Sequence, residues 1–179
     1  EMVPRKSGEL IERLTRFGSF FFGELLPGRP GFGGMISALR MKAEERALAD
    51  PDSLILIDGS PGLGCRVTAG IAGCDLALLV TEPGKGALRD LERIRGLLRF
   101  FHIPVRAVVN RYDIDAGLAR EAERFCRREE IPVIGRIPFS EEFNRAVIAG
   151  RTVVEGEESG LNRAVEKIYY RLRRDLYGS

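Results

Sequence analysis

Four short runs of apolar residues punctuate the chain, and none of them alternates regularly with polar positions. They cover residues 54–57, 76–80 and 105–109, the last interrupted only by Arg106, and a shorter run lies at 131–134. A strand with apolar side chains on both sides is typical of a parallel sheet whose two faces are covered by helices. The pattern therefore predicts buried parallel strands at these positions.

Between the runs, apolar residues recur every three or four positions, as on the buried face of a helix. In residues 87–101, for example, Leu88, Leu91, Ile94 and Leu98 fall on one side. Strands that alternate with helices predict a three-layer, doubly wound α/β fold with a mainly parallel sheet. The helical pattern covers residues 34–49, 64–73, 87–101, 116–129, 140–149 and 161–176.

The first 32 residues show neither pattern. Four phenylalanines between positions 17 and 22 lie among glycines, and a stretch rich in Gly and Pro follows them. Because glycine and proline interrupt regular elements, residues 1–32 are expected to form an irregular extension. Residues 33–179 are expected to form one domain.

Composition narrows the class of protein. The 179 residues are 44% apolar and 30% charged, which is typical of a globular domain, and the net charge of +2 is too balanced to predict nucleic-acid binding. Three cysteines without a C-x-x-C spacing predict free thiols in a cytoplasmic protein. The single histidine, His102, is expected to be structural, and no apolar run approaches the roughly 20 residues that span a bilayer.

Candidate chemistry lies where the predicted strands end, because ligands of doubly wound sheets bind beyond the carboxyl ends of the strands. Asp58 follows the run at 54–57 and precedes Gly59 and Gly62. Four apolar residues and an aspartate resemble a Walker B segment, whose carboxylate holds Mg²⁺, usually through a water, beside a nucleotide phosphate. The alternative is a strand that ends in an ordinary Asp-Gly turn.

Three further strand ends carry candidates. Asn110 follows the run at 105–109, where an amide can pair with the edge of a purine base, although a turn asparagine is the alternative. The loop at 135–140 could lie along the same base. The segment at 81–86 leads into a helix, so its free N–H groups could face an anion or simply form a turn and cap.

The order and spacing of these segments resemble the second half of the MinD/ParA/Mrp group of deviant-Walker P-loop ATPases, also described as the CobQ/CobB/MinD/ParA nucleotide-binding domain. The resemblance is closest to the MinD-superfamily branch with an inserted ferredoxin domain, and residues 2–9 resemble the segment after that insert. It covers most of residues 33–155. The residues that carry it are Ile57-Asp58-Gly59-Ser60-Pro61-Gly62-Leu63-Gly64-Cys65, Val80-Thr81-Glu82-Pro83, Asp90-Leu91-Glu92-Arg93, Val109-Asn110-Arg111-Tyr112-Asp113 and Gly135-Arg136-Ile137-Pro138.

The resemblance implies catalytic roles in the first of these segments. Asp58 resembles the Walker B carboxylate and would hold Mg²⁺ through a water. Gly59, Pro61 and Gly62 lie in the segment that resembles switch II, which senses the γ-phosphate, and Gly62 is expected to serve catalysis. The family often has proline at the positions of Ser60 and Arg66, so the resemblance leaves hydrolysis by this chain's switch segment open.

The resemblance also implies where a base would bind. Asn110 resembles the adenine-reading amide, Arg111 lies beside it, and Pro138 resembles the loop over the base. An alternative reading is possible because Asn110-Arg111-Tyr112-Asp113 also resembles the Asn-Lys-x-Asp sequence that reads guanine.

One element of the family is absent from the sequence. A Walker A loop cradles phosphates with glycine N–H groups, a lysine and a hydroxyl, and Gly84-Lys85-Gly86 lacks the leading glycines and the hydroxyl. The ferredoxin cysteines are absent too. We expect both to lie upstream in a parent protein, so ATP, Mg²⁺ and 4Fe–4S clusters are cofactors of the parent and none is expected on this chain alone.

The sequence is compatible with three functions: the carboxy-terminal portion of an ATPase, a non-catalytic interaction or scaffold module that kept the fold, and a GTP-specific protein. A homodimer is an open alternative, and the client protein is not predicted.

The last helix has a basic face opposite an apolar stripe. The basic residues are Arg163, Lys167, Arg171, Arg173 and Arg174. MinD proteins end in a membrane-binding helix of this kind, but the stripe is only core-sized, so membrane binding is not favoured.

The missing Walker A strand leads to a geometric prediction. In this family that strand lies between the strands that correspond to 54–57 and 76–80. Unpaired backbone groups in a buried slot cost about 1–3 kcal/mol each, so either these two strands pair directly, residues 1–32 fill the gap, or a second chain donates a strand. We expect direct pairing, because it needs no new residues. We also expect Asp58 to end a buried strand on the same sheet edge as Asn110 and Pro138.

Overall fold

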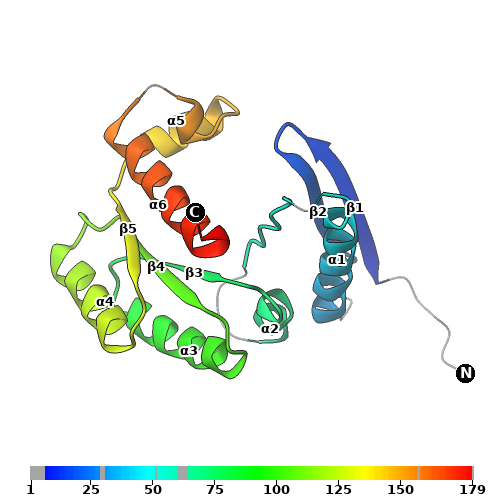
Figure 1. The fold of residues 1–179 in the computed structure, drawn as a ribbon, viewed down its shortest axis with the longest axis horizontal. Coiled ribbons are helices and arrows are strands. Elements are labelled where there is room, and N and C mark those ends of the chain that lie inside the picture. The colour runs from blue at the N-terminus through cyan, green and yellow to red at the C-terminus, as the bar shows by residue number, and fades with distance from the viewer. Residues whose placement is uncertain (1–6, 29–30, 51, 60–63, 157, 179) are drawn as a thin grey trace, which may run out of the picture. The chain divides into compact units, whose positions relative to one another are not determined.

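The structure of the chain is a computed structural model that describes residues 7–28, 31–50, 52–59, 64–156 and 158–178. It consists of two compact units, Glu1–Ala72 and Gly73–Ser179 (Figure 1). The first unit joins an antiparallel hairpin to two helices. The second unit contains a parallel sheet with helices on both faces.

The hairpin of the first unit consists of β1 (Gly8–Thr15) and β2 (Gly18–Leu25). Helix α1 (Phe32–Ala47) packs on β2, and the short helix α2 (Cys65–Ile71) packs on α1. The Arg40 guanidinium of α1 donates to three carbonyl groups at the end of α2. These hydrogen bonds tie the two helices together, since the last carbonyls of a helix have no partner within it.

The hairpin forms where the sequence predicted an irregular extension. Two glycines of the hairpin are needed for its geometry. Gly18 has a φ of 117°, which residues with a side chain rarely adopt. The Gly18 carbonyl accepts a 2.8 Å hydrogen bond from the Thr15 hydroxyl. Gly23 lies against Met35 of α1, where a Cβ would overlap the Met35 side chain. Residues 8–25 are therefore a regular ribbon whose glycines make the turn and permit close packing.

The apolar run at 54–57 does not form the predicted strand. Residues 53–59 carry no helix or strand, and Leu54 and Leu56 are 58% and 90% exposed. Burial on both faces needs strands on either side and helices above and below, and no described segment pairs with this run. The prediction of a buried strand here is wrong, and so is its direct pairing with 76–80.

The second unit has a three-stranded parallel sheet in the order β3 (Ala77–Thr81), β4 (Val105–Asn110) and β5 (Val133–Ile137). The register pairs Ala77 with Val105 and is shifted by an irregularity after Ala107 on the β5 side. These strands agree with the predicted runs at 76–80 and 105–109, whereas β5 begins two residues later than the run at 131–134.

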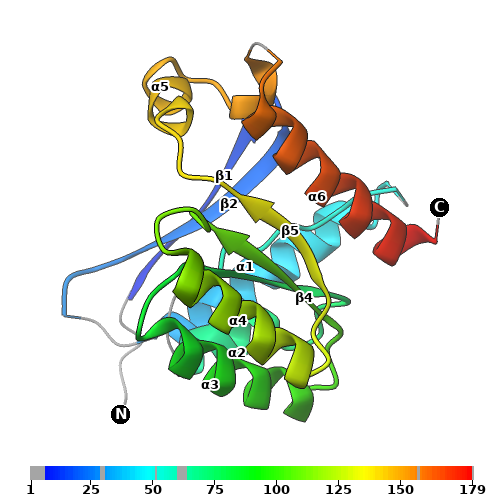
Figure 2. The ribbon, with the colours of Figure 1, turned by 90° about the vertical axis from the view of Figure 1, so that its left-hand side faces the viewer.

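Helices cover both faces of this sheet (Figure 2). Helix α3 (Ala87–Phe100) packs on β3, and α4 (Ala116–Arg128) packs on β4 and β5. Helix α6 (Gly160–Tyr177) packs on β5 from the opposite face. A short helix α5 (Glu142–Ile148) and a 3₁₀ turn η1 (Val153–Glu155) connect β5 to α6. The arrangement confirms the predicted three-layer α/β fold.

The sheet carries an apolar core on each face. Toward α3 and α4, the side chains of Leu98, Val109 and Cys126 are fully or almost fully buried. Burial raises the pKa of the Cys126 thiol, and the nearby Glu123 carboxylate raises it further, so this cysteine stays protonated. Toward α6, Val108 and Ile134 pack with Ile168. In the described part of the chain, no helix combines the length and apolar character needed to cross a membrane.

Candidate functional site

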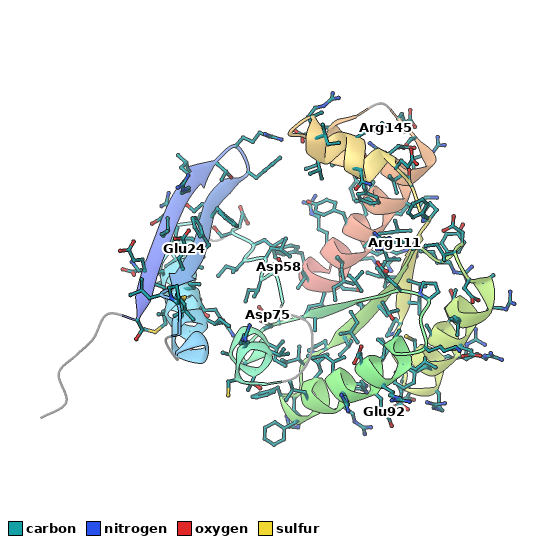
Figure 3. The ribbon with its side chains drawn as sticks, turned by 180° about the vertical axis from the view of Figure 1, so that it is seen from behind. Glu24, Asp58, Asp75, Glu92, Arg111 and Arg145 are labelled. Carbon is teal, nitrogen blue, oxygen red and sulfur yellow. The ribbon has the colours of Figure 1, made fainter. Side chains whose placement is uncertain are left out.

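The carboxyl ends of the three parallel strands lie along one edge of the sheet of the second unit. The register pairs Thr81 with Val109 and Asn110 with Ile137, and Pro138 follows Ile137 directly. The prediction that Asn110 and Pro138 share an edge is therefore confirmed. Figure 3 labels Arg111 at the end of β4, on this edge.

A carboxylate joins the first two strand ends. Glu82, the first residue after β3, accepts a 3.0 Å hydrogen bond from Nδ2 of Asn110 at Oε1. Its other oxygen, Oε2, accepts a 3.3 Å hydrogen bond from Nη1 of Arg111. Both charged side chains remain about half exposed, at 48% for Glu82 and 50% for Arg111, so the pair faces solvent.

The contact with Glu82 fixes which way the Asn110 amide points. A carboxylate only accepts hydrogen bonds, so the NH₂ group of Asn110 faces Glu82. The amide oxygen then points to the other side, where it can accept from a ligand. An exocyclic amine is the group that suits such an acceptor.

Arg111 is held in an uncommon backbone conformation. Its φ is 51°, in the left-handed region that costs a residue with a side chain on the order of 1–3 kcal/mol. The turn lets the Arg111 guanidinium reach Glu82 and lie 6.0 Å from the centroid of the Phe139 ring. The next residue, Tyr112, donates its N–H to the Ile137 carbonyl over 3.3 Å, which joins the turn to the end of β5.

The loop after β5 is anchored by Asp113. Oδ1 of Asp113 accepts a 2.7 Å hydrogen bond from the backbone N–H of Phe139, next to Pro138. Phe139 itself is 53% exposed, so its ring borders the site on the solvent side. Asn110, Arg111 and Pro138 are thus brought together by direct contacts between the loops that carry them.

The turn at 81–86 forms an ordinary helix start. Ala87 donates its N–H to the Gly84 carbonyl over 3.1 Å, and Asp90 donates to the Gly86 carbonyl over 3.2 Å. Asp90 also places a carboxylate in the first turn of α3. These contacts favour the turn-and-cap alternative over an anion site, because an acidic side chain already complements the helix dipole.

Asp58 and its neighbours belong to the first unit. Asp58 and Gly59 are exposed and follow a stretch without a strand, so Asp58 does not end a buried strand as predicted (Figure 3). Pro61 and Gly62 lie outside the described residues. Among the described residues, no group of three or more His, Cys, Asp or Glu side chains could hold a metal ion. Asp58 offers a single exposed carboxylate, a type of group that can contact a hydrated Mg²⁺ through a water.

The sequence did not predict that Glu82 contacts Asn110 and Arg111. The sequence pattern predicted only that Glu82 lies in a turn before a helix, and Asn110 and Arg111 were the predicted polar residues of the edge. The available signal was an acidic residue directly after a buried strand, the same signal that singled out Asp58. Parallel strand ends meet at one edge, so an acid after β3 and an amide after β4 were placed to contact each other.

The fold and this edge define a class of protein: a three-layer α/β unit with a P-loop NTPase-like fold, similar to that of solved MinD proteins. No protein-family model matches the chain. The chain is 27% identical over 173 residues to the uncharacterised Methanocaldococcus jannaschii protein MJ0578, covering 97% of the chain and 57% of that protein. It is 26% identical over 150 residues to the septum site-determining protein MinD of Thermotoga maritima, covering 80% of the chain and 54% of that protein.

A solved structure shows the same fold. It is the septum site-determining protein MinD of Pyrococcus horikoshii in complex with Mg-ADP, with a TM-score of 0.64 and 20% identity. The match covers 82% of this chain and 57% of that one. The chain thus spans a little over half the length of each of these three proteins.

Proposed function

We propose that the chain is the carboxy-terminal portion of a MinD/ParA-like P-loop ATPase whose full-length form binds and hydrolyses ATP with Mg²⁺. The observation that carries this proposal is the hydrogen-bonded cluster of Glu82, Asn110 and Arg111 at the carboxyl edge of the sheet. That edge is where doubly wound folds bind ligands. The similarity to a MinD protein in complex with Mg-ADP supports the choice of a nucleotide as the ligand.

The cluster suits an adenine base. With its NH₂ group turned toward Glu82, Asn110 presents its amide oxygen to the 6-amino group of adenine and keeps its second N–H for the adjacent ring nitrogen. Pro138 and Phe139 supply an apolar border on which the ring would rest. Guanine has a carbonyl oxygen at the same ring position, so the oriented amide oxygen disfavours it.

In this proposal, the other predicted site residues contact the phosphate end of the nucleotide. Asp58 would contact the hydrated Mg²⁺, and Gly59, Pro61 and Gly62 would approach the γ-phosphate with their backbones. Bound Mg²⁺ would neutralise phosphate charge. The Walker A loop is expected in the remainder of the full-length protein.

Exposed apolar surface supports the view that this is part of a larger unit. Val80 on β3 is 60% exposed, and Leu56 is 90% exposed, although both lie in runs typical of buried strands. Further strands and helices of the full-length protein would cover such side chains.

The proposal is tested by ATP hydrolysis in the full-length protein carrying Asp58→Asn. Hydrolysis is expected to fall about a hundredfold or more, because a metal-contacting carboxylate is lost, while the melting temperature stays unchanged. Asp52→Asn is the matched control, since Asp52 is an exposed aspartate of the same unit, and it should leave hydrolysis intact. Equal rates for Asp58→Asn and wild type would contradict the proposal.

A non-catalytic interaction module is the second candidate, and the exposed position of Asp58 is the observation that favours it. A full-length protein that has a Walker A loop yet shows no Mg-ATP hydrolysis would support this candidate. A GTP-specific protein ranks third, because Oδ1 of Asp113, the group that would read guanine, already accepts from the Phe139 N–H.

A further inference from the structure

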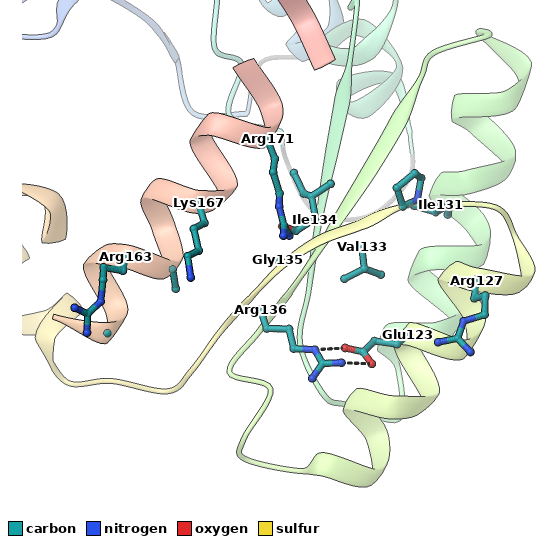
Figure 4. A pocket seen from close by; sticks show the side chains of 13 residues that line it. Glu123, Arg127, Ile131, Val133, Ile134, Gly135, Arg136, Arg163, Lys167 and Arg171 are labelled. Atoms are coloured by element: carbon teal, nitrogen blue, oxygen red, sulfur yellow. Dashed lines mark hydrogen bonds and ion pairs between the residues drawn. The ribbon is translucent and has the colours of Figure 1, made fainter. Parts of the chain in front are cut away.

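A groove runs along β5 in the second unit, on the side of the strand away from β4. It has a volume of about 710 Å³. Figure 4 shows β5 between α6, which contributes Arg163, Lys167 and Arg171, and α4, which contributes Glu123 and Arg127. The floor of the groove is the strand itself, from Ile131 to Arg136.

The strand at the bottom of the groove is an edge strand. β5 pairs with β4 on one side and, within the described residues, with no strand on the other. An edge strand presents unpaired N–H and C=O groups, which can pair with an added strand. One of its carbonyls, that of Ile134, accepts a 2.5 Å hydrogen bond from Nη1 of Arg171, so the arginine covers part of this edge.

The walls of the groove are strongly cationic. Arg127, Arg136, Arg163, Lys167 and Arg171 line it together with a single carboxylate, that of Glu123. Glu123 forms an ion pair with Arg136, with an N–O distance of 2.5 Å between Oε1 and Nε, and its Oε2 accepts a 2.8 Å hydrogen bond from Nη2 of Arg136. Arg127 and Lys167 have no ion pair with any described residue. The groove therefore has an excess of positive charge directly beside an open strand edge.

We propose that this groove binds an extended acidic segment of a partner protein, which adds to β5 as a further strand. Backbone groups of the segment would pair with the free edge of β5, as in strand addition elsewhere. Its carboxylates would contact the cations of α4 and α6 on the two sides. Arg171 would turn from the Ile134 carbonyl to a carboxylate of the incoming segment.

The positive charge of the groove and its open strand edge favour an acidic peptide over two other occupants, a second copy of the chain and a nucleic acid. A second copy of the chain would bring the same cations to the same edge, and like charges at close range disfavour such pairing. A nucleic acid would satisfy the cations but cannot form the ladder of backbone hydrogen bonds that an open strand offers. The acidic peptide satisfies both features.

Binding of a defined peptide to the 179-residue chain tests the proposal. The probe is a fluorescein-labelled ten-residue peptide of alternating glutamate and threonine, and its binding is measured by fluorescence anisotropy. Lys167→Glu is expected to raise its Kd about tenfold or more, because an exposed cation of the groove becomes a like charge. Arg173→Glu is the matched control, since it makes the same type of charge change on the same helix but outside the groove, and it should change the Kd less than about threefold.

A second probe separates strand addition from simple charge attraction. The same peptide with every backbone nitrogen methylated keeps its carboxylates but cannot donate backbone hydrogen bonds, so it is expected not to bind. Equal binding of the methylated peptide, or an equal effect of Lys167→Glu and Arg173→Glu, would overturn the proposal. Binding of a ten-residue oligothymidylate that is sensitive to Lys167→Glu, without binding of the peptide, would assign the groove to nucleic acid and also overturn it.

Discussion

In the proposed site, the hydrogen bond between Glu82 and Asn110 determines which group of the Asn110 amide would face a base. The carboxylate of Glu82 can only accept, which holds the NH₂ group of Asn110 toward it and leaves the amide oxygen for the ligand. Arg111 contacts the second oxygen of the same carboxylate. Three side chains from two strand ends thus form one unit, and a change in Glu82 is transmitted to Asn110.

Replacing Glu82 with glutamine is expected to relax base selectivity in the full-length protein. A glutamine side chain can donate as well as accept, so the Asn110 amide is free to turn over and present its NH₂ group to the oxygen of guanine. The ratio of ATP to GTP affinity should fall about tenfold, the range of one hydrogen bond to a misoriented group. Isothermal titration with both nucleotides measures it, and an unchanged ratio would show that Glu82 does not orient the amide.

At the scale of residues, the sequence predicted the edge but not its internal contacts. Asn110 and Pro138 could be placed together because each follows a run that ends at the same edge of a parallel sheet. The contact with Glu82 depends on the left-handed turn at Arg111 and on the direction of side chains after the strands, which spacing along the chain does not encode.

At the scale of elements, α6 packs on β5 across a glycine. A Cβ at Gly135 would overlap the side chain of Ile168, so the helix can approach the strand this closely only because no side chain intervenes. Ile168 completes the apolar cluster with Val108 and Ile134 on this face of the sheet. The position of α6 therefore depends on Gly135.

Gly135→Ala is expected to lower the free energy of unfolding by about 1–3 kcal/mol, because the new methyl group overpacks the contact with Ile168. Gly96→Ala is the matched control. Gly96 is an exposed residue inside α3 with open space around it, so alanine there should raise the free energy by about 0.5–1 kcal/mol through helix propensity. Urea denaturation measures both, and a stabilising Gly135→Ala would contradict the packing described here.

The end of α6 is tied to the start of β4 by an ion pair. Nε of Arg106 donates to Oδ2 of Asp175 over 2.6 Å, and this contact lowers the pKa of the Asp175 carboxyl below its ordinary value of 3.8. A carboxyl whose pKa is lowered by folding stabilises the folded state above its ordinary pKa. That stabilisation is lost as the pH falls through the lowered pKa.

Asp175→Asn should therefore lower the melting temperature at neutral pH and have no effect in strong acid. The difference between wild type and variant is expected to be constant above about pH 5 and to shrink as the pH falls below the ordinary pKa of the carboxyl. Thermal denaturation over this pH range measures it. A difference that persists unchanged in strong acid would show that Asp175 contributes through packing and not through its charge.

The elements that the sequence predicted well are those that find a partner strand and a covering helix within the described part of the chain. The runs at 76–80 and 105–109 pair with each other, and the helices that cover them follow in sequence. The run at 54–57 has the same composition but no neighbouring strand among the described residues, so its pattern alone did not produce a strand. The hairpin at 8–25 was missed because its glycines suggested irregular structure, although they serve the turn and the contact with Met35.

At the scale of the whole molecule, the chain corresponds to a little over half of MJ0578 and of the two MinD proteins described above. The edge that carries Glu82, Asn110 and Arg111 lies in Gly73–Ser179, and the proposed activity also needs a phosphate-binding loop, which we expect in the remainder of the full-length protein. Contacts with phosphates supply much of the affinity for a nucleotide. In the proposed site, the base therefore contacts this chain, and the phosphates mainly contact the remainder of the full-length protein.

Isothermal titration of Mg-ATP tests this assignment most directly, with three samples compared in one experiment: the full-length protein, its Asn110→Ala variant and the 179-residue chain. We predict that the full-length protein binds Mg-ATP and that Asn110→Ala weakens binding about tenfold or more through the lost base contacts. The 179-residue chain is expected to bind weakly or not at all. An unchanged Kd for Asn110→Ala, or micromolar binding by the 179-residue chain, would contradict it.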